Sequence, residues 1–161
     1  MHTIKIDKTH AIVEFVLEGI VRMDEMQQFV RSLQQATLGL HGREIKIKAD
    51  LRALRPASAE VAEMIRNVQE FGIRSGVKRV AEIVESDVVA LQLNRVAHES
   101  GTDKILCRFW EEDSARDWLI YGGDALMSRR EPVCGRQSRP DFYAPFNITP
   151  PPSSRGGRPS R

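Results

Sequence analysis

The sequence predicts an α/β fold with a five-stranded, mainly parallel sheet and four helices, in the order β-β-α-β-α-β-α-β-α. Three observations support this fold. Apolar residues alternate with polar ones along short segments, as in strands. They recur every three or four positions along longer segments, as in helices. Strand-like and helix-like segments alternate along the chain. Such an order gives parallel strands joined by right-handed crossovers, while an opening hairpin adds an antiparallel edge.

The first three elements are two strands and a helix. Residues 3–7 and 11–17 alternate or are continuously apolar, and the short connection between them is typical of a hairpin. The first helix begins at Asp24, its predicted N-cap, and Gly39 and Gly42 end it.

The remaining elements repeat the strand–helix unit. They are strand 44–50, helix 59–74, strand 77–84, a helix from Ser86 and Asp87 to Gly101, strand 104–109, and a last helix that Asp113 or Ser114 caps and Gly122 and Gly123 end. The last strand should place Ile105, Cys107 and Phe109 on one face. We interpret Cys107 as a small buried hydrophobic residue. Cys107 and Cys134 lie in very different sequence contexts and suggest no disulfide framework.

Charge and composition divide the chain near Ser128. Residues 128–161 carry seven arginines against Glu131 and Asp141, a net charge of +5, whereas residues 1–127 have a net charge of −3. We therefore predict a folded domain at residues 1–127 and a basic tail, rich in Pro, Arg and Ser, at residues 128–161.

The tail is expected to be largely disordered, because its composition cannot bury enough apolar surface to offset the entropy of ordering. Within it, Phe142, Tyr143 and Phe146 form an apolar island at residues 141–149. This island is a candidate docking segment for another protein, or it packs on its own domain or on a second copy.

The N-terminal sequence, the hydropathy and the cysteine usage of the chain favour a cytoplasmic protein. The N-terminus is polar and unlike a signal peptide, and no apolar run approaches the roughly 20 residues that a membrane span needs. We therefore expect no membrane insertion. The cysteine usage also fits a reducing compartment.

The loop at residues 50–58 is the best candidate for a functional site, since loops after strand ends carry function in open α/β sheets. Asp50 ends the strand, and Ser58 can cap the next helix. Arg52 and Arg55 could hold an anionic group, or form an ordinary surface ion pair with Asp50.

No complete catalytic motif accompanies this loop. The four histidines lie on different elements, and no spacing resembles a metal site, so neither metal nor cofactor is predicted. Trp110 stands at or just past the end of the last strand, where it could mark an interface or be an ordinary, partly buried tryptophan. These features favour a protein that is not an enzyme.

Residues 1 to about 121 resemble the STAS fold of anti-sigma factor antagonists and of small stand-alone bacterial STAS-like proteins. The likeness rests on the element order, on Asp50-Leu51 at the strand end, and on the stretches 79–84 and 109–119. In the antagonist branch, a serine at the start of the following helix is phosphorylated by a partner kinase, so the resemblance makes Ser58 a candidate phosphosite. The chain departs from the family's Asp-Ser-Ser-Gly signature, and the plain alternative is that Ser58 is only an N-cap.

We therefore expect a non-enzymatic regulatory or scaffolding protein that acts through protein–protein interaction or self-association. The interaction residues would be Asp50, Arg52, Arg55, Ser58 and Trp110, together with the tail segment. One alternative is a binding module for a small apolar or anionic ligand. A second is nucleic-acid contact by the arginine-rich tail, which the acidic domain makes less favourable.

Overall fold

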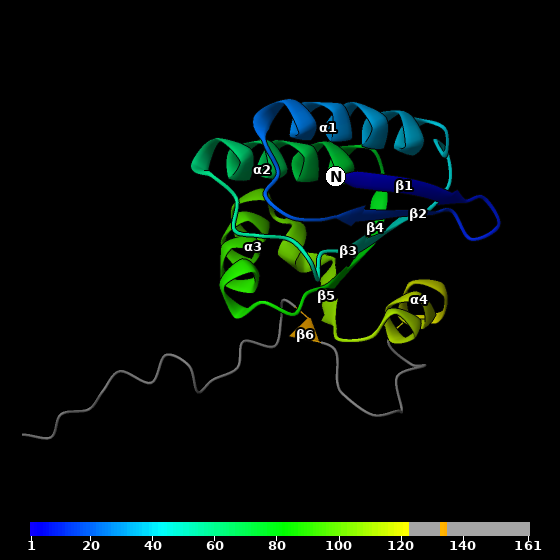
Figure 1. Ribbon diagram of the computed structural model, residues 1–161. Coiled ribbons are helices and arrows are strands. Elements are labelled where there is room, and N and C mark those ends of the chain that lie inside the picture. The colour runs from blue at the N-terminus through cyan, green and yellow to red at the C-terminus, as the bar shows by residue number, and fades with distance from the viewer. Residues whose placement is uncertain (123–132, 135–161) are drawn as a thin grey trace, which may run out of the picture.

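The computed structural model describes residues 1–122 and the pair 133–134. In chain order, the elements are β1 (His2–Asp7), β2 (Ile12–Leu17), α1 (Met23–Leu38), β3 (Ile45–Asp50), α2 (Ala59–Arg74), β4 (Val77–Ile83), α3 (Asp87–Ser100), the 3-10 helix η1 (Thr102–Lys104), β5 (Leu106–Phe109), α4 (Glu112–Tyr121) and β6 (Val133–Cys134) (Figure 1). The predicted α/β class, the five strands β1–β5 and the four helices are confirmed.

The strands lie in the sheet in the order in which they occur in the sequence, β1 to β6. β1 and β2 form the predicted antiparallel hairpin, and β2 to β5 are parallel neighbours. β6 pairs antiparallel with β5 and adds a short strand that the sequence did not indicate. Because all three crossovers advance in the same direction and are right-handed, α1, α2 and α3 lie on the same face of the sheet.

The sheet therefore has two unequal faces (Figure 1). The face under α1, α2 and α3 holds the larger core, in which Val13, Ile47 and Val80 come from successive parallel strands. Among the described helices, α4 is the one that covers the other face, and its Ala115, Trp118 and Leu119 pack on β4 and β5. The rest of this second face, toward β1, is left to polar side chains.

Two helix starts differ from the prediction. α1 is capped by Arg22, whose backbone N–H donates to Glu25 Oε2 at 3.1 Å, and Asp24 lies inside the first turn. α4 begins at Glu112 after Glu111, ahead of the predicted Asp113 or Ser114. Carboxylates are favourable anywhere in a first helical turn, so the acidic runs did not single out the capping position.

The last parallel strand also starts later than predicted. η1 occupies Thr102–Lys104, and Ile105 follows it in a non-extended conformation. Ile105 therefore packs against the larger core, whereas Cys107 and Phe109 face α4. The predicted sharing of one face by all three residues is wrong, because strand alternation begins only at Leu106.

Cys107 is buried, as predicted, but it is disulfide-bonded, so the expectation of no disulfide is wrong. The backbone register of β5 and β6 places Cys134 opposite Cys107. The different sequence contexts of the two cysteines gave no sign of this, because a strand pairing brings distant residues together. Within residues 1–122 and 133–134, no helix has the length and apolar character that crossing a membrane requires.

Candidate functional site

The loop after β3 is fixed to its neighbours by backbone hydrogen bonds. The N–H of Leu51 donates to the carbonyl of Ile83 on β4 at 2.9 Å. The N–H of Gly19 donates to the carbonyl of Ala53 at 2.8 Å, and the N–H of Arg55 donates back to the carbonyl of Gly19 at 3.0 Å. The loops that follow β2 and β3 are thereby joined at the carboxyl end of the parallel strands. We call these two hydrogen-bonded loops the ordered ledge.

α3 holds the far end of the same loop through a single side chain. The Gln92 amide accepts from the backbone N–H of Ala57 at 2.8 Å and donates to the Ala57 carbonyl at 2.7 Å. A primary amide can bond a backbone group in both directions at once. The loop after β2, the loop after β3 and helix α3 are therefore joined into one unit. The hydrogen bonds that join them involve residues 19, 53, 55, 57 and 92.

Ser58 is the N-cap of α2. Its Oγ accepts from the N–H of Val61 at 3.3 Å, and the residue is exposed. The capping role inferred from the sequence is confirmed. The phosphosite stays a prediction.

Asp50 and Arg52 form a two-point ion pair. Arg52 Nε donates to Asp50 Oδ1 at 2.9 Å, and its second nitrogen lies 2.5 Å from Oδ2. This contact lowers the pKa of Asp50 and raises the pKa of Arg52. Arg52 thus forms the surface ion pair with Asp50 that was the ordinary alternative, and Arg55 is exposed.

The Asp50–Arg52 pair ends a chain of alternating charges across the second face of the sheet. From the hairpin inward, the successive contacts join Asp7, Arg116, Glu14, Lys48, Glu112, Arg52 and Asp50. Lys48 is the most buried member, with its ammonium 3.3 Å from Glu14 and 2.5 Å from Glu112. The contact with Lys48 lowers the pKa of Glu112, and the contacts with His10 and Arg116 lower that of Asp7.

Sequence reasoning missed this network. Its only local signal is the charged residues that alternate with apolar ones along β2 and β3, namely Glu14, Lys46 and Lys48. Alternation shows that these side chains share a face. It does not show that α4 brings Glu112 and Arg116 over that face.

Large apolar side chains are exposed around the ordered ledge. Ile20 follows Gly19 and is 76% exposed, whereas Val88 and Leu91 on α3 are 61% and 64% exposed. Val88 lies one helical turn before Gln92, on the side of α3 that holds the loop. We call Ile20, Arg55, Pro56, Val88 and Leu91 the loop surface. Trp110, 44% exposed, directly follows β5 at the same edge of the sheet.

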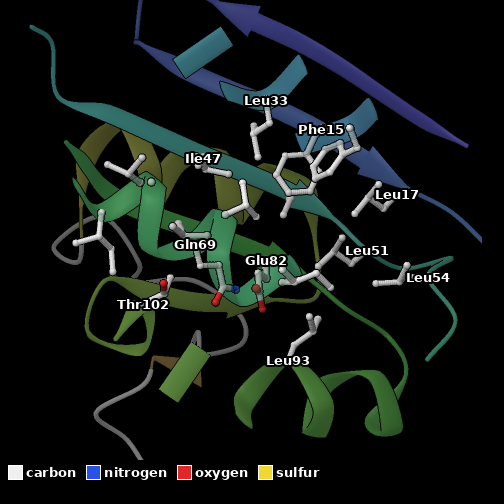
Figure 2. A pocket seen from close by; sticks show the side chains of 18 of the residues that line it. Phe15, Leu17, Leu33, Ile47, Leu51, Leu54, Gln69, Glu82, Leu93 and Thr102 are labelled. Carbon is white, nitrogen blue, oxygen red and sulfur yellow. The ribbon is translucent and has the colours of Figure 1, made fainter. Parts of the chain in front are cut away.

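A cavity lies in the larger core, between the sheet and α2 (Figure 2). Its volume is about 70 Å³, and most of its lining is apolar. The polar lining residues are Gln69, Glu82 and Thr102 (Figure 2). Glu82 was not singled out from the sequence, because in strand β4 it reads as an ordinary solvent-facing acid.

The tail residues Phe142, Tyr143 and Phe146, with the whole segment 141–149, lie outside the described residues. The same holds for all the tail arginines. Tail docking and nucleic-acid contact therefore stay predictions. In the part of the chain that the structure does describe, no group of three or more His, Cys, Asp or Glu side chains is placed to hold a metal ion.

Comparison with known proteins supports the fold and no more. No family model and no curated protein matches the sequence. Among solved structures, the chain is similar to an uncharacterized protein of the DUF3478 family from Shewanella loihica PV-4, described as having a SpoIIAA-like fold. The two are 24% identical with a TM-score of 0.57, and the alignment covers 73% of this chain and 93% of the other. The fold of this chain is thus SpoIIAA-like, that is, STAS-like, as the sequence predicted.

Proposed function

We propose that this chain is a non-enzymatic regulatory or scaffolding module that binds a protein partner through the loop surface. One observation carries the proposal: Ile20, Val88 and Leu91 are exposed on segments that hydrogen bonds lock to one another. Exposed apolar groups on an ordered scaffold are candidates for an interaction site.

The rigidity of the ledge favours binding. Each side chain or loop that must be ordered on association lowers the affinity, and here the backbone of the loop is already fixed. Arg55 and Pro56 are exposed in the loop that these hydrogen bonds hold, so they supply a cation and a conformationally restricted residue to the same surface. Arginine is among the residue types enriched in binding hot spots.

The test is affinity capture with the full chain as bait. We expect Val88→Asp and Leu91→Asp each to abolish recovery of the same partner that the unchanged chain retains. Leu38→Asp is the matched control, since Leu38 is a 59% exposed leucine on α1 and lies outside the loop surface. Equal recovery by all three variants would contradict the proposal.

The contribution of the tail is tested in the same assay. A full-length chain with Phe142, Tyr143 and Phe146 replaced by alanine is expected to recover less partner if the tail segment adds a second contact. Light scattering of the unchanged chain and of Leu91→Asp decides whether the partner is a second copy. A dimer that only the unchanged chain forms would identify self-association.

A further inference from the structure

α2 packs less closely on the sheet than its two neighbours. α1 buries five residues and α3 buries four, but α2, with 16 residues, buries only Val61 and Gly72. Its apolar positions Ile65 and Val68 are half-buried and line the cavity. The space between α2 and the sheet is therefore incompletely filled, which is unusual for a protein interior.

The cavity is large enough to matter. Its volume of about 70 Å³ exceeds the roughly 10–15 Å³ that one water needs, and is near half of the ~150 Å³ engineered cavity that accepts benzene. The walls include Phe15, Phe29, Ile47 and Leu93 (Figure 2 labels three of these). A bound molecule would be mainly apolar and smaller than benzene.

A buried carboxylate supplies the polar feature. Glu82 is 3% exposed, and burial raises its pKa. Arg108 donates through Nε at 3.1 Å and through a terminal nitrogen at 2.9 Å, and both bonds end on Oε2 of Glu82. Among the hydrogen bonds of the described residues, none ends on Oε1.

The neighbouring polar groups are already oriented. Ser100 Oγ donates to Gln69 Oε1 at 2.8 Å, and Ser100 and Thr102 lie 2.9 Å apart between their hydroxyl oxygens. These contacts hold Gln69 and Thr102 at the cavity wall beside the apolar lining. An apolar cavity with a few polar groups is the usual form of a small-molecule site.

We propose that the cavity beneath α2 binds a small neutral alcohol, whose hydroxyl donates to Glu82 Oε1 and whose carbon chain fills the space against Ile65 and Val68. The charges of the site select a neutral molecule. Glu82 and Arg108 already neutralise each other, so a charged ligand would lose its hydration in the cavity without gaining an unpaired counter-charge. Oε1 keeps some accessible surface in the empty cavity, and an apolar molecule without a donor would cover it without giving it a partner.

The proposal is tested on the full chain with 1-propanol and with its isomer ethyl methyl ether, which has the same atoms but no hydroxyl donor. Methyl NMR spectra are recorded during titration with each. We expect saturable shifts at Ile47, Ile65 and Leu93, with the alcohol binding about tenfold more tightly, the ratio that one hydrogen bond typically contributes. Equal affinities, or no saturable shift at these methyl groups, would overturn the proposal.

Three variants distinguish binding in the cavity from general solvent effects. Ala49→Leu adds carbon atoms to a buried position in the cavity wall and should abolish the shifts. Ala59→Leu adds the same atoms at an exposed position on α2 and should leave them unchanged. Glu82→Gln, which nearly preserves shape, should remove the preference for alcohol over ether. A preference that survives Glu82→Gln would also overturn the assignment, even if Ala49→Leu fails to fold.

Discussion

The side-chain amide of Gln92 on α3 bonds both the N–H and the carbonyl of Ala57, at 2.8 and 2.7 Å. One side chain thereby satisfies two backbone groups in the loop that precedes α2. The position of this loop relative to α3 depends on that contact, and so does the geometry of the loop surface.

Gln92→Ala should therefore loosen the loop. We expect a loss of about 1–2 kcal/mol in the free energy of unfolding, since two hydrogen bonds that each contribute about 1 kcal/mol are removed. Amide exchange should rise at residues 53–57 in particular. Gln28→Ala, at an exposed glutamine of α1, is the control and should change neither quantity. Unchanged exchange in Gln92→Ala would show that the loop is held by its backbone bonds alone.

The N-cap of α2 gives a second prediction. Ser58→Ala should lower the free energy of unfolding by about 1 kcal/mol, because the N–H of Val61 loses its acceptor. Ser58→Asp should restore most of that stability, since aspartate caps well and its charge favours a helix N-terminus. Urea denaturation measures both. An unchanged free energy of unfolding in Ser58→Ala would argue against capping as the role of this serine.

Gly72 and Gly101 have different backbone conformations, so the same substitution at the two positions gives a matched comparison. Gly72 is helical, and an added Cβ would make ordinary contact with Val77, at 3.5 Å from its Cγ2 and 4.0 Å from its Cβ. Gly72→Ala should therefore raise stability by up to about 1 kcal/mol through helix propensity. Gly101→Ala should lower it by roughly 1–2 kcal/mol, because Gly101 has a φ of +79°. Thermal unfolding should show melting temperatures displaced in opposite directions.

Lys48 lies at the centre of the charge network. Lys48→Met should destabilise the fold by roughly 2 kcal/mol, less than for a fully buried pair, because Glu112 is half exposed. The exposed Lys5→Met is the control and should have little effect. Carboxyl NMR should also show the Glu112 pKa rising toward its ordinary value in Lys48→Met. No change in that pKa would contradict the contact.

Stability should fall in acid. Folding lowers the pKa of Asp7, Asp50 and Glu112, so their contribution is complete above the unfolded values near about 4 and is lost as the pH falls through the folded values. Glu82 has a raised pKa and acts in the opposite direction, so its contribution grows as the pH falls. Urea unfolding between pH 7 and pH 3 should show a smaller acid loss in Asp7→Asn and a larger one in Glu82→Gln.

Much of the fold was predictable because the signals are local. The buried line of α3, Val89, Leu93, Val96 and Ala97, follows directly from helical spacing. The start of α2 follows from Ser58 and Pro56, and its predicted limits are those observed. These features depend on residues within one or two turns of each other, so the sequence by itself determines them.

The tertiary structure decided what depends on distant residues. The contact of Gln92 with Ala57 spans 35 residues, and that of Arg116 with Asp7 spans 109. Glu82 reads as a surface acid until α2 covers its face of the sheet. No spacing rule records which helix covers a strand or how closely it packs, because these result from three crossovers placed on one face. The elements and the candidate loop were therefore set by the sequence, whereas the charge network, the loop surface and the cavity exist only in the folded chain.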